Sequence, residues 1–470
     1  MPGSATTRRP STLNRPLALL VAGTFFMENL DATIIATAAP AMARDLGVAA
    51  VDVNAAMTAY LVTVAIGIPV SGWLTDRFGG RRILLLAIAV FTLSSVLCAL
   101  SVNLPMLVVA RIVQGAGGAL MVPVGRLVVL RVTARSDLLD AIAYLTWPAL
   151  LAPVVAPAIG GWIVTVAGWP WIFLINVPLG VVAAVVAWRI VPDERAERVG
   201  RLDLVGFLLC AGLLGSALVA LESVSAGAAD SGTLVVLLLG LAAALTVAVV
   251  LWWRRTPEPL LRFGSLRVAS FRTGNAGGLV YRMLINAVPF LLPLLFQLRF
   301  GLSPVRAGLL VLLLFVGNLA IKPVTSPLIR RFGFRLVLII SVAAGAAMMA
   351  AIAAFTPTTS LLVIVPVLVA SGAFRSIGFS GYNSLQFADI EPADMADANT
   401  LSATLQQLAV GLGVAVGALL LRFGDALAPD GGSISAYGIA FAALAVLMLI
   451  PLVEAVVLPR TAGDEVAARR

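Results

Sequence analysis

The sequence predicts an all-α membrane protein, and two observations carry that prediction. First, 60% of the 470 residues are hydrophobic and only 12% are charged, whereas a soluble protein of this length needs a charged surface. Second, apolar runs of about 20 residues recur along the whole chain, and each is long enough to cross the hydrocarbon core of a bilayer. The runs do not alternate apolar and polar residues and are too long for barrel strands, so we expect helices.

Fourteen candidate membrane-spanning helices follow one another along the chain. Their approximate limits are 16–40, 53–73, 82–101, 104–130, 138–163, 170–190, 203–222, 232–253, 271–298, 304–328, 335–355, 360–385, 399–422 and 436–458. We expect a cytoplasmic tail at 1–15, a six-helix bundle at 16–200, two inserted helices at 201–262, a second six-helix bundle at 263–458 and a cytoplasmic tail at 459–470.

The distribution of basic residues predicts the orientation in the membrane. With the N-terminus in the cytoplasm, the inner tails and loops hold 23 of the 32 basic residues and the outer loops hold only 4. Cytoplasmic segments of membrane proteins carry this excess. An even number of spans returns the C-terminus to the same side. We therefore expect a multi-pass protein of the cell inner (plasma) membrane, and we read the basic pI as topology rather than as a nucleic-acid partner.

Two loops of the chain resemble each other. Ser71–Leu86 reads SGWLTDRFGGRRILLL and Thr325–Ile340 reads TSPLIRRFGFRLVLII, and both contain RFG followed two residues later by arginine, at an offset of 254 residues. The alternative is a chance match between basic loops. Placement of the match in equivalent loops of two six-helix blocks instead favours two repeated halves, which are typical of secondary transporters. The predicted plan is 6 + 2 + 6 helices with pseudo-twofold halves.

Five motifs resemble those of the major facilitator superfamily, and within it the fourteen-span drug:H+ antiporters. Gly72–Arg82 (GWLTDRFGGRR) is similar to the family's signature loop between spans two and three. ARIVQGAGGA at Ala110–Ala119 resembles the fourth-span motif, and APAIGG at Ala156–Gly161 resembles the antiporter motif of span five. LDATIIATAAP at Leu30–Pro40 resembles the first-span motif, and WPWIFLINVPLG at Trp169–Gly180 resembles the opening of span six.

The resemblance implies the major facilitator fold and two functional segments. A gating loop would comprise Gly72, Asp76, Arg77, Gly79, Arg81 and Arg82, and the antiporter motif would comprise Pro157, Gly160 and Gly161. In the family the gating loop holds the inner side shut through an ion pair. The alternative is that these arginines only fix the topology. Two departures from the family pattern are Ala156, where glycine is usual, and Arg330, where the first half has Asp76.

Two carboxylates, Glu28 and Asp31, lie inside the apolar run 16–40. At mid-bilayer a carboxylate costs about 2.5–3.5 kcal/mol, so such residues usually face a cavity and act. Helix rise places Asp31 and Arg111 at a similar height of about 20 Å above the inner surface. Burial favours a protonated carboxylate and a nearby arginine favours the ionised form, so the group can load and release a proton. We predict proton coupling by Asp31, Arg111 and Glu28, with Asp31 ranked first on the resemblance. The alternative is a static ion pair.

The remaining basic residues inside the predicted spans are Arg126, Arg282, Lys322 and Arg375. Intramembrane cations that lack a carboxylate partner face water or bind an anion. We predict that the substrate-binding candidates are Arg282, Lys322, Arg375, Tyr281, Asn286 and Asn318. The alternative is snorkelling to the inner interface, which is easiest for Arg126. The sharper hypothesis is a substrate that bears negative charge, such as an organic acid or its metal chelate.

These observations together predict a proton-coupled efflux transporter rather than an enzyme. The chain has no histidine and only two cysteines, both in apolar runs, and no phosphate-binding P-loop. We therefore expect no metal site, no cofactor and no ATP-driven step. The expected partners are a small-molecule substrate, protons and the lipid bilayer, with the chain acting as a monomer. Two alternatives are a proton-linked importer of an anionic metabolite and a non-transporting membrane sensor or scaffold.

Overall fold

The computed structural model describes residues 14–48, 52–134, 137–193, 200–225, 232–256, 259–427, 435–459, 461–463 and 466. Within these ranges every regular element is a helix, so the predicted all-α class is confirmed. The first group of helices is α1 (Arg15–Leu46), α2 (Asn54–Gly67), η1 (Ile68–Val70), α3 (Ser71–Phe78), α4 (Gly80–Ala99), α5 (Leu104–Val132), α6 (Leu138–Ala167), α7 (Trp171–Leu174) and α8 (Asn176–Ile190).

The remaining elements form a helix pair and a second large group. The pair is α9 (Leu204–Ser225) and α10 (Gly232–Arg255). The second group is η4 (Phe263–Arg267), α11 (Ala269–Leu294), η5 (Leu295–Arg299), α12 (Pro304–Ala320), α13 (Lys322–Ala353), α14 (Leu361–Ala388), η6 (Pro392–Asp394), α15 (Met395–Leu427), α16 (Ala436–Leu447) and α17 (Leu449–Val457). We call α1–α8 the N-half and α11–α17 the C-half.

Twelve helical segments of the described residues are long and apolar enough to cross a membrane. Two shorter apolar helices, Leu204–Ala220 and Arg306–Ala320, lie where the seventh and tenth spans are predicted. The count of fourteen spans therefore stays a prediction. The predicted limits 304–328 need correction, because α12 ends at Ala320 and the chain continues into α13. Helix α1 also extends to Leu46, where Gly47 ends it with a left-handed φ of 67°.

Two equivalent turns mark one end of the bundle. Gly79, between α3 and α4, has φ 92°, and Gly333, at a kink inside α13, has φ 77°. Only glycine adopts this region without a steric cost, so both RFG sequences fold into the same kind of turn. We call the end of the bundle that holds these two turns the RFG end.

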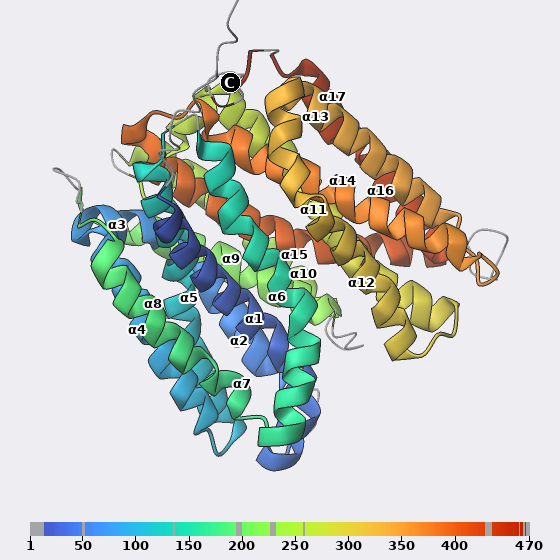
Figure 1. Cartoon of the computed structure of the whole chain (residues 1–470), viewed down its shortest axis with the longest axis horizontal. Helices are drawn as coiled ribbons and strands as arrows, with labels where there is room; N and C mark the ends of the chain where they lie inside the picture. Colours follow the sequence, from blue (N-terminus) through green and yellow to red (C-terminus); the bar gives the residue numbers. More distant parts are fainter. Residues whose placement is uncertain are drawn as a thin grey trace, which may run out of the picture.

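The two halves pack together more closely at the RFG end than at the opposite end. One buried apolar cluster joins Leu127, Leu130 and Leu138 of the N-half to C-half residues such as Phe271 and Phe334. The apolar cluster formed by the opposite ends of the N-half helices has no member from the C-half. In Figure 1 the N-half (blue to green) and the C-half (yellow to red) lie side by side, with α6 between α1 and the C-half helices.

Candidate functional site

The predicted pair Asp31 and Arg111 meets inside the N-half. Both residues are buried, at 1% and 0% exposure. Arg111 Nη1 lies 2.5 Å from Asp31 Oδ2. The other carboxylate oxygen, Oδ1, accepts hydrogen bonds from Gln114 Nε2 at 3.0 Å and Asn176 Nδ2 at 2.8 Å. Helices α1, α5 and α8 thus each supply part of one polar cluster, which we call the Asp31 cluster.

Further contacts complete the Asp31 cluster. Ser95 of α4 accepts a hydrogen bond from Gln114 Nε2 at 2.8 Å, and the Arg111 guanidinium lies 4.1 Å from the centre of the Tyr60 ring. Sequence reasoning missed Gln114, although it follows Arg111 by three residues and so shares its helix face. It also missed Asn176, which no local pattern connects with Asp31. A buried network with this many partners holds its members in one arrangement.

Glu28 lies one turn from Asp31 but in a different environment. Its Oε2 is buried and, within the described residues, has no hydrogen-bond partner. The side chain lines a cavity of about 190 Å³ between the two halves. The structure therefore places the two acids apart: Asp31 is enclosed in the N-half, and Glu28 faces the interface between the halves.

The cavity between the halves, which we call the central cavity, has a mixed lining. Its polar lining residues come from both halves: Glu28 and Arg126 from the N-half, and Arg282, Asn286, Gln406 and Gln407 from the C-half. Apolar side chains, among them Ile68 and Phe379, complete the wall. A few polar groups on an apolar wall are what a small-molecule site usually offers.

Arg282 is the most deeply buried of the candidate cations, at 1% exposure. Its guanidinium donates to Asn383 Oδ1 at 3.0 Å and Gln386 Oε1 at 3.2 Å, and its Nε has no partner in the part of the chain that the structure describes. All its hydrogen-bond acceptors in the described residues are neutral oxygens. A buried arginine without a carboxylate partner keeps its positive charge available to an anion.

Lys322 and Arg375 also lie inside the C-half, but neither lines the central cavity. Lys322 is 5% exposed, and its Nζ donates to Ser380 Oγ at 2.6 Å. Arg375 Nη2 donates to Asn286 Oδ1 at 3.4 Å, so Asn286 connects Arg375 with the cavity wall. The burial of Lys322 argues against the snorkelling alternative for that residue.

Tyr281 and Asn318 are enclosed in the C-half. The Tyr281 hydroxyl donates to the backbone carbonyls of Phe374 and Arg375, and the side chain is fully buried. Asn318 is 4% exposed on α12, where α12 packs tightly on Gly372 of α14. Neither residue lines the central cavity in this conformation, so a substrate contact for them stays a prediction.

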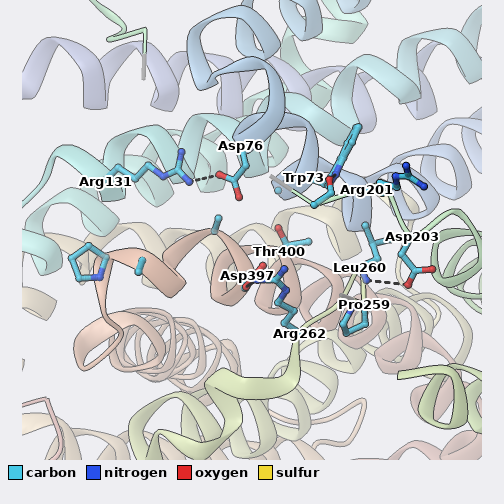
Figure 2. A pocket seen from close by; sticks show the side chains of 15 residues that line it. Trp73, Asp76, Arg131, Arg201, Asp203, Pro259, Leu260, Arg262, Asp397 and Thr400 are labelled. Atoms are coloured by element: carbon cyan, nitrogen blue, oxygen red, sulfur yellow. Dashed lines mark hydrogen bonds and ion pairs between the residues drawn. The ribbon is translucent and has the colours of Figure 1, made fainter. Parts of the chain in front are cut away.

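The RFG end is closed by charged contacts within and between the halves. Asp76 Oδ1 pairs with Arg131 Nη2 at 2.5 Å, as Figure 2 shows. The family resemblance implies an ion pair in this loop without naming the partner of Asp76, which is the last arginine of α5. Arg330, at the position equivalent to Asp76, instead crosses to the N-half and pairs with Asp140 at 2.9 Å.

The other arginines of the predicted gating loop have different surroundings from Asp76. Arg81 donates to the backbone carbonyl of Trp188, Arg82 lies 3.9 Å from Asp193, and Arg77 is exposed. Gly72 lies where the two halves meet at the RFG end, which we call the gate. A Cβ at this position would collide with Thr400 Oγ1 of α15. Glycine thus allows α3 and α15 to approach closely at this end of the molecule.

The antiporter-motif segment packs on the first helix. A Cβ at Gly160 of α6 would meet Ile34 and Thr37 of α1, whereas one at Gly161 would meet nothing. The Pro157 side chain lies outside the described residues. Close packing of α6 on α1 keeps the helix that carries Glu28 and Asp31 tightly held in the N-half.

Helices that span a membrane, two repeated halves and a charged cavity between them are the features of a secondary transporter. Consistent with this, a family model described as "Major Facilitator Superfamily" matches residues 21–414. The chain belongs to this superfamily, so it is a multi-pass membrane transporter and not an enzyme.

Among its relatives is MdtD of Pectobacterium atrosepticum, which is named provisionally as a multidrug resistance protein. The two chains are 36% identical over 405 residues, which cover 86% of each. MdtD of Salmonella paratyphi A is also 36% identical, over 406 residues that cover 86% of this chain and 85% of its own.

Solved structures share the fold at low sequence identity. The human organic anion transporter MFSD10 has a TM-score of 0.69 at 15% identity, with 95% of this chain and 100% of that chain covered. The proton:xylose symporter XylE has a TM-score of 0.66 at 15% identity, with 96% of each chain covered. The predicted major facilitator fold is therefore confirmed.

Proposed function

We propose that this protein is a proton-coupled exporter, a drug or metabolite:H+ antiporter that works by alternating access. The observation that carries the proposal is the central cavity, which both halves line. Glu28, whose Oε2 has no hydrogen-bond partner among the described residues, shares this cavity with the cation Arg282. The halves meet at the RFG end through Arg330 and Asp140. Rocking of the halves about the cavity would open one end and close the other.

The distribution of arginines supports a cytoplasmic RFG end, with both chain termini on that side of the inner membrane. In that orientation the conformation described here is closed toward the cytoplasm by the contacts of Gly72 with Thr400 and of Arg330 with Asp140. The antiporter-like segment with Gly160 and Gly161 supports export over import.

Proton coupling would use the two acids of α1 differently. Glu28 faces the cavity and could exchange a proton with it. Protonation of Asp31 would weaken the 2.5 Å pair with Arg111 and so change the packing of α1 against α5. Glu28 would then be the first residue to accept a proton from the cavity. The Asp31–Arg111 pair would couple proton binding to the change in helix packing.

The substrate we propose carries negative charge, as an organic acid or its metal chelate does. The support is Arg282, whose partners in the described residues are neutral and which lines the cavity. Arg126 lines the same cavity, and its Nε donates to Asn399 Oδ1 at 2.6 Å. With Glu28 protonated, these residues would make the cavity strongly cationic.

Transport in liposomes tests this function. Purified protein is reconstituted with a trapped pH dye under an imposed proton gradient, and panels of cationic drugs and citrate-like anions are added. Anion-evoked proton flux that disappears in Arg282→Gln but persists in Arg299→Gln, an exposed control, is the expected result. Flux evoked only by cations and insensitive to Arg282→Gln would overturn the anionic substrate. Absence of flux with every compound would favour a sensor or scaffold.

A proton-linked importer is the second candidate, and the position of Glu28 favours it. An anion bound near Glu28 would stabilise the protonated carboxyl group, so anion and proton would bind together and move in the same direction. Reversal of the imposed gradient separates the two functions. An exporter moves anion against the proton flow, whereas an importer accumulates anion in the direction of the proton flow.

A further inference from the structure

The inserted helices α9 and α10 lie at the seam between the halves. Helix α9 packs against α2 of the N-half and α15 of the C-half, and α10 packs mainly on α9. Much of α10 remains exposed, as at Val236 and Leu237. The pair therefore contacts both halves through α9.

One carboxylate joins the two segments that flank the pair. Asp203 Oδ1 accepts from the backbone N–H of Gly206 at 2.8 Å, at the start of α9, and from Trp252 Nε1 of α10 at 3.0 Å. Asp203 Oδ2 accepts from the backbone N–H of Leu260 at 3.1 Å. Residues 200–203, before α9, are thus held against residues 259–262, after α10.

Each of these segments is also tied to a different half. Trp73 of α3 donates its indole N–H to the carbonyl of Gly200 at 3.0 Å. Arg262 Nη1 lies 3.4 Å from Asp397 Oδ2 of α15. These residues line one cavity of about 300 Å³ at the RFG end, beside the Asp76–Arg131 pair. In Figure 2, Trp73 lies above Asp397 and Arg262, and a dashed line joins Asp203 to Leu260.

We propose that Asp203 is a positioning residue that makes the two flanking segments into a strap across the closed RFG end. The strap runs from the N-half to the C-half through Trp73, Gly200, Asp203, Leu260, Arg262 and Asp397. Alternating access must separate α3 from α15 at this end. The hydrogen bonds of Asp203 therefore hold the gate closed, and their loss shifts the population toward a conformation open at the RFG end.

A thiol placed in the gate measures this shift directly. Thr400→Cys places a thiol where the hydroxyl lies and removes the γ-methyl group; the native hydroxyl has no hydrogen-bond partner in the described residues and lies against Gly72. The native thiols, Cys98 and Cys210, are buried. The full chain with Thr400→Cys is treated with a membrane-impermeant maleimide, and the labelling rate is compared with and without Asp203→Ala. We expect a rise of about tenfold, the factor that corresponds to the loss of a hydrogen bond to a charged group.

Two milder variants guard against a folding defect. Asp203→Asn keeps the shape and one acceptor oxygen, and Trp73→Phe keeps the ring but removes the donor to Gly200. Both should raise labelling of the same thiol by a smaller factor. The matched control is Asp45→Ala, which removes a carboxylate that accepts an indole N–H from Trp169 at 2.8 Å at the opposite end. It should leave the labelling rate unchanged.

The labelling assay needs neither substrate nor proton gradient, so its outcome is independent of the proposed transport function. Unchanged labelling in Asp203→Ala and in both milder variants would overturn the strap. Equal increases in Asp203→Ala and Asp45→Ala would also overturn it, because they would indicate general loosening rather than release of the gate.

Discussion

Two carboxylates one turn apart on α1 differ in their hydrogen-bond partners and in their surroundings. Asp31 is paired and buried, whereas Glu28 lies at the wall of the central cavity and its Oε2 has no partner within the described ranges. A proton that enters from the cavity meets Glu28 without breaking any hydrogen bond of Oε2, but it must break an ion pair to reach Asp31. The two residues should therefore respond differently to neutral amide substitutions.

Asp31→Asn should abolish proton flux and lower stability, because it leaves Arg111 charged and buried without its partner. Removal of one member of a buried pair costs about 3–5 kcal/mol. The double variant Asp31→Asn/Arg111→Gln should recover much of that stability without recovering flux. Thermal unfolding in detergent and dye-reported proton flux in liposomes measure the two quantities. If flux returned with stability, the cluster would be only a static support.

Glu28→Gln should leave thermal stability nearly unchanged, because no hydrogen bond to Oε2 is lost. Substrate-evoked proton flux should nevertheless fall sharply, because the amide cannot carry a proton. Substrate binding should also become less dependent on pH than in the native protein. Native-like proton flux in Glu28→Gln would exclude Glu28 as the proton entry and return that role to Asp31.

At the scale of the helix, the two RFG turns depend on glycine in the same way. Gly79→Ala and Gly333→Ala should each destabilise the protein by about 1–3 kcal/mol, because alanine pays the steric cost of this positive-φ conformation. Gly345→Ala, in the same helix as Gly333, is the control, because only Met448 approaches its Cβ position and at 4.0 Å. Unfolding midpoints compare the three variants. Equal midpoints for Gly333→Ala and Gly345→Ala would contradict the strain argument.

Some of this architecture can be predicted from the sequence because it follows from local rules. Helix rise alone placed Asp31 and Arg111 at one height, and they are in contact. Helix rotation and neighbour choice do not follow from local rules. For that reason Asn176 and Arg131, the partners of Asp31 and Asp76, could not be identified before the helices were packed. The break between α12 and α13 at Ile321 was also missed, although Lys322 and Pro323 follow it directly.

At the scale of the whole molecule, transport requires the closed RFG end to open. Asp140→Cys/Arg330→Cys, bridged by a reducible bifunctional thiol reagent, should stop transport by fixing the two halves together at this end. Reduction should restore it. The single-cysteine variants treated with the same reagent are the controls, and counterflow of substrate in liposomes is the measurement. Transport that continues in the bridged protein would mean that this contact does not separate during the cycle.

The repeated loops differ in one charge, and that difference has a thermodynamic consequence. Asp76 pairs with Arg131 inside its own half, whereas Arg330, 254 residues later, pairs with Asp140 of the other half. The two loops share the glycine turn but carry opposite charges beside it, and the Arg330 side chain reaches across to the other half. The crossing pair is about one third exposed, so dissolved ions screen it. The equilibrium between closed and open RFG ends should therefore shift toward open as ionic strength rises, even without substrate.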